Sequence, residues 1–356
     1  MQHRDFLTRP SHGRCQTPVP RGSRQSPGTA LHGDFRLIDL RHWKLVFRLI
    51  VITLVVYGIG HTLADAREQF AIHQVNWTSL SVGWLVVAGV AYLAGMLPCW
   101  WFWHRVLHAM GARPRYRETM PAFYIGHLGK YFPGKALVVV IRTALIRGPR
   151  VDTLAATISV FVETLTMMAV GALVAASLLL TTTADSWLFW LALALFCLAG
   201  IPTLPPVFRK VVRTICARRG YEQVTQVVNA LRLPLLASGW LTIAGGWFLM
   251  GLSLWAVLQS MTTTSEMPTA LPLEPVQALV LLTATVGLAL VAGFLSLLPG
   301  GIGVRELVVT TLLVPVYGEL AAILSAVLLR ITWLLAELVA SGFLYVSTRL
   351  QSGNQT

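Results

Sequence analysis

The sequence TMPAFYIGHLGKYFPGKALVVVIRTALIR, residues 119–147, is mostly apolar, yet Pro133-Gly134 interrupts it and cations are spread along it. A second stretch, PGGIGVRELVVTTLLVPV at 299–316, has a glycine-rich start, and Pro315 falls near its end. Because Pro and Gly break the helical hydrogen-bond ladder, neither stretch can cross a membrane as one straight helix. We expect each to be a re-entrant or broken helix, with Pro315 interrupting the second one again. Such backbone is tolerated at membrane depth only where protein or a wet cavity satisfies its polar groups.

The composition around these stretches is that of a membrane protein. Of the 356 residues, 55% are hydrophobic and only 12% are charged, whereas soluble domains carry about 25% charged residues. The apolar residues form long blocks with few charges, which is typical of transmembrane helices. The sequence therefore predicts an all-α, polytopic helical membrane protein with about seven to eight transmembrane helices plus re-entrant or broken helices. The expected spans are residues 45–63, 80–103, 153–180, 187–208, 234–259, 275–298 and 320–347.

The net charge of +13 is concentrated in a few connecting segments, and eight of the 28 Lys and Arg residues lie within residues 1–44. Residues 104–118 and 209–233 are rich in arginine, whereas residues 181–186 and 260–274 contain no Lys or Arg. This alternation follows the positive-inside rule and disfavours nucleic acid as the partner of the basic residues. We expect a multi-pass protein of the cell inner (plasma) membrane with a cytoplasmic N-terminus.

Three regions follow from this pattern. Residues 1–43, rich in Arg, Pro, Gly, Ser and Gln, predict a disordered basic cytoplasmic tail. Residues 44–348 form the transmembrane domain, and 349–356 a short C-terminal tail. Within the domain, residues 209–232 resemble an amphipathic helix on anionic lipid. Tryptophans near span ends predict an interfacial aromatic belt; they are Trp77, Trp84, Trp100, Trp101, Trp103, Trp187 and Trp190.

The two Pro-Gly breaks suggest an internal repeat. Pro133-Gly134 and Pro299-Gly300 are separated by 299 − 133 = 166 residues. Each precedes a short apolar helix and then a span with a lone charge, Glu163 or Arg330, which are 330 − 163 = 167 residues apart. Paired broken helices in corresponding positions are typical of transporter binding sites. Chance is the alternative, because Pro-Gly is common and the copies share few side chains.

Helix starts after such breaks favour anion binding. A helix that begins just after Pro-Gly presents unpaired N–H groups and the positive end of its dipole. Lys135 and Arg142, seven residues apart, share a helix face near the first break, and Arg305 lies at the second. We expect these three cations to form a pocket for an anionic group. The alternative, cations that snorkel to lipid phosphates, is favoured for Lys130, Arg147 and Arg150.

The lone charges Glu163 and Arg330 need partners or a task. A charge at mid-helix costs about 2.5–3.5 kcal/mol on insertion scales. We expect Glu163 to form an ion pair in the bundle interior, and the alternative is that this pair only fixes helix packing. Glu306 cannot face its neighbour Arg305 on a helix, so its partner lies elsewhere; Glu337 could share the network. The partners open to Glu163 are Arg330, Arg142 and Arg305.

No pattern of catalytic or cofactor-binding residues appears in the sequence. His104 and His108 have the i, i+4 spacing of metal ligands, but no third ligand accompanies them. P-loop, HExxH and GxSxG motifs are absent from the sequence. We therefore expect no metal, no cofactor and no enzymatic activity.

Four motifs in order carry a family resemblance: GHLGKYFPGKALVVVIRTALIRG, FVETL, LPGGIGVRE and LLRITW. Together they resemble the lysylphosphatidylglycerol synthase transmembrane family, also called flippase-like, which includes the membrane half of the multiple peptide resistance factor. The resemblance covers about residues 45–348 and implies movement of a lipid between leaflets. By motif match, the residues around the pathway would be Lys130, Pro133, Gly134, Arg142, Glu163, Pro299, Gly300, Gly301, Gly303, Arg305, Glu306 and Arg330.

The resemblance has one departure that limits the expected function. Two-part members carry a large soluble aminoacyl-transferase domain, which this sequence does not contain, so synthesis of lysylphosphatidylglycerol is not expected. The leading hypothesis is a flippase-like protein that binds and translocates a lipid with an anionic or modified headgroup, either an anionic phospholipid or a polyprenyl-phosphate-linked lipid. The alternatives are an intramembrane transferase that uses Glu163 or Glu306 as its base, and an accessory subunit of a lipid- or glycan-modifying enzyme.

Overall fold

The computed structural model describes residues 80–131, 136–182, 186–201, 232–261, 273–296 and 303–353, with a few single positions outside these ranges, Gly301 among them. The expected span 45–63, the tail 1–43 and most of 209–232 lie outside the described residues. The same holds for five candidate site residues, Pro133, Gly134, Lys135, Pro299 and Gly300.

Five long helices dominate the described part of the chain, and each contains an apolar window suited to crossing a membrane. With about 1.5 Å of rise per residue, their 21 to 35 residues match or exceed the thickness of a bilayer core of about 30 Å. The expected all-α architecture is confirmed, because each helix contains or nearly coincides with one expected span. They are α2 (Val82–Ala109), α5 (Thr153–Thr182), α9 (Leu233–Met261), α10 (Pro275–Leu295) and α12 (Glu319–Gly353).

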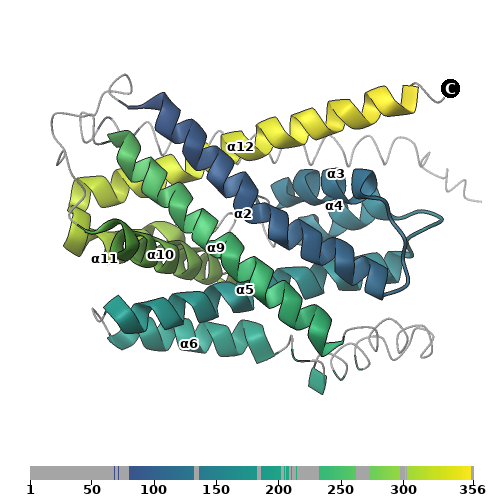
Figure 1. Ribbon diagram of the computed structural model, residues 1–356, viewed down its shortest axis with the longest axis horizontal. Coiled ribbons are helices and arrows are strands. Elements are labelled where there is room, and N and C mark those ends of the chain that lie inside the picture. Colours follow the sequence, from purple (N-terminus) through teal and green to yellow (C-terminus); the bar gives the residue numbers. More distant parts are fainter. Residues whose placement is uncertain are drawn as a thin grey trace, which may run out of the picture. The chain divides into compact units, whose positions relative to one another are not determined.

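Helix α6 (Ser186–Gly200) is shorter than the span expected at residues 187–208. Its 15 residues rise only about 22 Å, which is less than a bilayer core. The expectation counted apolar residues and ignored Gly200 and the prolines that follow it in the sequence, which cannot continue a helix. Helix α6 packs along α5 (Figure 1).

The first interrupted stretch is broken, as expected. It consists of α3 (Tyr116–His127), the 3-10 helix η2 (Leu128–Tyr131) and α4 (Ala136–Ile146). The two α-helices lie side by side as a hairpin (Figure 1). Gly129 permits this, because a Cβ there would lie 2.7 Å from the backbone N of Val138. Neither helix is long enough to span a bilayer, so the lengths of α3 and α4 fit the expected re-entrant hairpin.

The second interrupted stretch contains α11 (Val304–Tyr317), which is a single short helix. Its cap residue Gly303 has φ 80°, a left-handed conformation that favours glycine. The expectation that Pro315 interrupts this helix is wrong, because α11 continues to Tyr317 and ends at Gly318. Pro315 lies in the last turn and has no N–H to donate to Thr311 O, yet the helix continues for two residues beyond it. Helix α12 begins directly after Gly318 and packs on α11.

Helices α2 and α9 run antiparallel and in close contact, and Figure 1 shows them crossing the bundle together. Ser81 N donates to Ser260 O at 3.0 Å, which joins the start of α2 to the end of α9. The two backbones meet at Gly95 and Gly246, where a Cβ on Gly95 would lie 2.8 Å from Gly246 O. Small residues at such a crossing allow the close packing that holds membrane helices together.

Trp103 on α2 lies in the core and not in the expected aromatic belt. Its side chain is fully buried, and its indole N–H donates to Ser159 Oγ at 2.9 Å. Trp187 and Trp190 on α6 are more than half exposed, as a belt position requires. Trp103 was assigned to the belt because the expected span ended at residue 103. That assignment was wrong, because α2 continues six residues further, to Ala109.

Candidate functional site

A cavity of about 440 Å³ lies between the hairpin of α3 and α4 and the long helices. Its size falls within the range of about 300–1,000 Å³ that is usual for small-molecule sites. Most of its lining is apolar, contributed by α4, α5, α9 and α10. A few polar or ionisable side chains also line it, and these are Tyr92, His127, Lys130, Arg142, Glu163, Thr164 and Arg305.

The cavity reaches the outer surface of the bundle between α4 and α5. Val140 on α4 and Phe161 on α5 line the cavity, and they are 45% and 49% exposed. Exposed apolar side chains on membrane-spanning helices are the ones that face lipid. The lining of the cavity therefore reaches the outer surface of the described helices between α4 and α5.

Arg142 and Glu163 form a buried ion pair in the wall of this cavity. Arg142 Nη1 donates to Glu163 Oε2 at 2.5 Å, and each side chain is only 2% exposed. The guanidinium carbon of Arg142 lies 4.0 Å from the ring centre of Phe123 and 5.5 Å from that of Trp103. These rings add cation–π attraction to the ion pair. Of the three partners open to Glu163, the structure selects Arg142.

Arg330 pairs with a different carboxylate. Its Nη1 donates to Glu306 Oε1 at 2.9 Å and so ties α12 to α11. The expectation that the partner of Glu306 lies away from Arg305 is confirmed. The two lone mid-helix charges, Glu163 and Arg330, do not contact each other and belong to separate pairs. Each pair instead joins a short helix to the long helix that follows it.

Lys130 is held inside the bundle. It forms an ion pair with Glu337 on α12, and its side chain is 13% exposed. The snorkelling interpretation of Lys130 is therefore wrong, because an inward carboxylate binds the ammonium group. Arg150 does lie at the surface, where it pairs with Glu118 at 2.9 Å and is 46% exposed.

Arg305 projects from the first turn of α11 to the cavity. Its Nε is buried and has no hydrogen-bond partner among the described residues. Gly293 and Gly301 enclose its stem, and a Cβ on Gly301 would lie 2.9 Å from the same Nε. Gly301 has φ +71° and Gly303 has φ +80°, but a Cβ on Gly303 would meet nothing within 4 Å. Both glycines set the backbone, and Gly301 also leaves room for the Arg305 side chain.

The charges around the cavity do not balance. Lys130, Arg142 and Arg330 each have a carboxylate partner, which leaves Arg305 as the cation without an ion pair in the described part of the chain. An unpaired buried charge is costly unless it has a ligand or a task. The arrangement can therefore accept one negative charge from a bound group.

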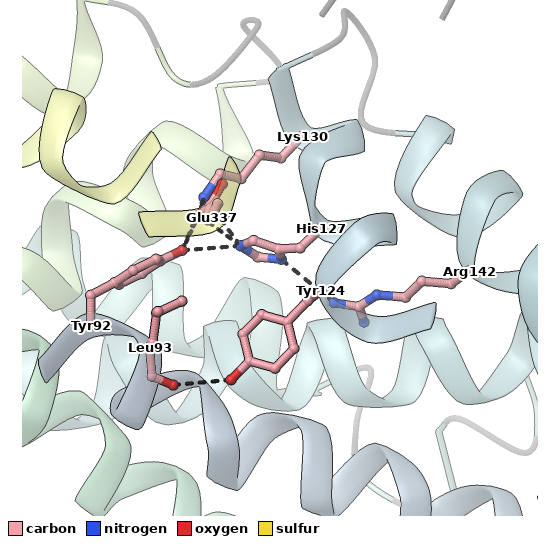
Figure 2. A network of polar contacts seen from close by, with 7 residues as sticks. All are labelled: Tyr92, Leu93, Tyr124, His127, Lys130, Arg142 and Glu337. Atoms are coloured by element: carbon pink, nitrogen blue, oxygen red, sulfur yellow. Dashed lines mark hydrogen bonds and ion pairs between the residues drawn. The ribbon is translucent and has the colours of Figure 1, made fainter. Parts of the chain in front are cut away.

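Two polar residues of the cluster around Lys130 and Glu337, His127 and Tyr92, were missed by the sequence analysis. His127 lies 3.3 Å from Tyr92 Oη and 3.1 Å from Lys130 Nζ, measured from its Nε2. Tyr92 also donates a hydrogen bond to Glu337, which places it in the same cluster (Figure 2). A signal for each was present, because His127 precedes Lys130 by three residues and Tyr92 puts a phenol inside an apolar span.

The sequence matches a known family of membrane proteins. A family model described as Lysylphosphatidylglycerol synthase TM region matches residues 45–340, which is most of the chain. A search of curated proteins gives no match. The match and the five apolar helices of the described part identify a multi-pass integral membrane protein of a lipid-related family. The chain belongs to the family of the lysylphosphatidylglycerol synthase transmembrane region.

Proposed function

We propose that this protein binds the headgroup of an anionic or modified membrane lipid in the cavity and translocates that lipid between leaflets. One observation carries the proposal: a cavity whose lining reaches the outer surface at Val140 and Phe161 is also lined by Arg305, a cation without an ion pair among the described residues. A headgroup could enter between Val140 and Phe161 while its acyl chains stay in the bilayer.

Arg305 and the start of α11 lower the cost of bringing a charged headgroup into the cavity. A lone ion loses several kcal/mol of solvation when it leaves water, and only close partners offset that loss. Arg305 offers a guanidinium whose planar donors match phosphate oxygens. The helix start beside it, capped by Gly303, adds the partial positive charge of unpaired N–H groups.

Movement of the lipid requires the cavity to open to each side in turn. The Lys130–Glu337 and Arg330–Glu306 pairs join the short helical segments η2 and α11 to α12. Contacts of this kind can exist in two arrangements, because each charge can exchange one partner for another or for the headgroup. We propose that these pairs rearrange between the two states.

The test is lipid movement by the purified full chain in liposomes. Labelled phosphatidylglycerol and a labelled polyprenyl phosphate would be placed in one leaflet, and their appearance in the other would be followed by quenching. We expect Arg305→Gln to slow movement at least about tenfold, the equivalent of about 1.4 kcal/mol. Arg150→Gln, which alters an exposed arginine outside the cavity, is the matched control and should move lipid like the unaltered chain.

Two results would count against the proposal. The first is movement of both lipids at the rate of protein-free liposomes. The second is an Arg305→Gln variant that is folded and as active as the unaltered chain. Lipid movement that appears only when a second, co-purifying enzyme is present would favour the accessory-subunit alternative instead.

A further inference from the structure

His127 lies between two ion pairs, and Figure 2 shows it at the centre of the polar cluster. Its Nε2 is 3.1 Å from Lys130 Nζ and 3.7 Å from Glu337 Oε1, so it adjoins the first pair. On the other side of the ring, Nδ1 is 3.5 Å from Arg142 Nη2, which belongs to the second pair. His127 itself lines the cavity.

The partners of the ring determine which nitrogen carries the proton in the neutral form. Arginine can only donate hydrogen bonds, so Nδ1 must offer its lone pair to Arg142. Nε2 adjoins the donor Lys130 Nζ at 3.1 Å, but it also lies near two acceptors, Tyr92 Oη at 3.3 Å and Glu337 Oε1 at 3.7 Å. Nδ1 has no acceptor near it among the described residues, so the proton of the neutral ring belongs on Nε2. Nδ1 is therefore the atom at which His127 can take up a second proton.

The balance of charges around His127 indicates that its Nδ1 can bind a second proton only when an anion is bound nearby. With neutral His127, the three cations that face it exceed the two nearby carboxylates by one positive charge. Protonation would raise this excess to two in a buried site, which burial and the neighbouring cations oppose. A bound anion removes the excess. The groups that face His127 from the surrounding elements are Tyr92, Lys130, Arg142, Arg305 and Glu337, with Glu163 behind Arg142.

We propose that His127 binds a proton together with the lipid headgroup, so that the protein takes up one proton for each anionic headgroup it binds. This rests on the proposed function. The proton comes from water and bonds to Nδ1, the imidazole becomes an imidazolium, and its new N–H donates to a headgroup oxygen beside Arg142. When the headgroup leaves, Nδ1 returns the proton to water. A headgroup and its proton therefore cross the membrane in the same direction.

Binding of the two ligands is reciprocal. If the headgroup favours the protonated ring, the proton must favour headgroup binding by the same factor. Where one proton is taken up per headgroup, the apparent affinity rises about tenfold for each unit of falling pH. The change should fall between about pH 8 and about pH 6, where a histidine can change its charge.

The experiment measures the affinity of the full chain, held in nanodiscs of phosphatidylcholine, for labelled phosphatidylglycerol. This probe carries one phosphodiester charge that does not change over the range, so any pH dependence belongs to the protein. We expect the affinity to rise by up to about a hundredfold from about pH 8 to about pH 6, which is about tenfold for each pH unit. His127→Gln keeps a donor and an acceptor but cannot titrate, and its affinity should be flat. His108→Gln, which removes an exposed histidine bonded to Pro114 O, should behave like the unaltered chain.

A second readout needs no variant. Calorimetric titration of the unaltered chain in buffers of different ionisation enthalpy reports the protons taken up on lipid binding, and we expect a value near one within the sensitive range. Binding of phosphatidylglycerol with the same affinity at every pH and no proton uptake would overturn this inference and leave the proposed function standing. An absence of phosphatidylglycerol binding at every pH would overturn both.

Discussion

At the scale of single residues, a carboxylate inside a membrane helix is a stronger signal than any apolar residue around it. Glu163 was expected to have a cationic partner because an unpaired charge at that depth is costly. The sequence could not choose among three arginines, since the choice depends on how the hairpin folds back. Gly126 lets α3 pack closely against the Arg142 stem, because a Cβ at this position would lie 2.3 Å from Arg142 Cγ.

Lys130 shows the opposite case. Its position in a basic, interrupted stretch favoured a surface role, and only the three-dimensional structure reveals that Glu337, 207 residues later, reaches it. Contacts over such separations depend on how α12 packs against the hairpin, which no local pattern encodes. His127 and Tyr92 were missed for the same reason, because uncharged polar residues are common in membrane helices and carry little signal alone.

The Arg142–Glu163 pair yields a prediction of stability. Glu163→Gln leaves the Arg142 guanidinium buried without its counter-charge, and breaking a buried pair costs about 3–5 kcal/mol. We expect the variant to show a clearly lower midpoint of thermal unfolding in detergent. Glu118→Gln breaks the exposed Arg150–Glu118 pair, which is 46% and 44% exposed, and should cost no more than about 1 kcal/mol. Equal midpoints for the two variants would contradict the burial argument.

At the scale of elements, the sequence located the breaks well and the helix ends poorly. Glycine and proline mark where a ladder cannot continue, so the hairpin of α3 and α4 and the start of α11 were expected. The end of α6 at Gly200 was missed because hydropathy outweighed the prolines after it. The continuation of α11 past Pro315 was missed because the sequence analysis treated every internal proline as an interruption, whereas α11 keeps its helical path for two residues after losing that hydrogen bond.

The glycines before α11 allow a test of what the second break does. Gly301→Ala and Gly303→Ala both place a Cβ on a residue with positive φ, and each should lose about 1–2 kcal/mol of stability. Only the first would also press on Arg305, with its Cβ 2.9 Å from Nε, whereas the second meets open space. We therefore expect Gly301→Ala to weaken lipid binding more than Gly303→Ala. Because its Cβ would also lie 2.9 Å from the backbone Cα of Gly293, Gly301→Ala should unfold at the lower midpoint of the two. Equal lipid affinities would show that the position of Arg305 does not depend on Gly301.

At the scale of the whole molecule, each half of the chain has an ion pair between a short helix and the long helix that follows it, and the charges of the two pairs are reversed. In the first, a cation on the short helix α4 pairs with a carboxylate on α5; in the second, a carboxylate on α11 pairs with a cation on α12. The paired residues are 163 − 142 = 21 and 330 − 306 = 24 positions apart. This correspondence favours the internal repeat that the Pro-Gly spacing suggested. The repeat stays a prediction, because the Pro-Gly residues lie outside the described part of the chain.

The arrangement of helix ends makes the membrane orientation testable. Arg113 N donates to Arg150 O at 3.3 Å, so the loops after α2 and before α5 meet. Because α2 and α9 are antiparallel, Arg232 at the start of α9 lies at this same basic end, and Ser81 and Ser260 lie at the other. Positive charge on one end predicts that this end faces the cytoplasm.

Single cysteines at the two ends would check this orientation in living cells. In a chain whose four native cysteines are replaced by alanine, Arg232→Cys marks the basic end. Glu274→Cys, at the start of α10, marks the other end. Gly251 on α9 packs against Thr283 on α10, and these residues lie similar distances from the end of α9 and the start of α10, as in an antiparallel pair. Both cysteine positions are exposed. A membrane-impermeant maleimide should label Glu274→Cys in intact cells and Arg232→Cys only after permeabilisation, because translocating arginine-rich loops is disfavoured. The reverse pattern would place the basic loops outside, and with them the end from which the hairpin of α3 and α4 enters the bundle.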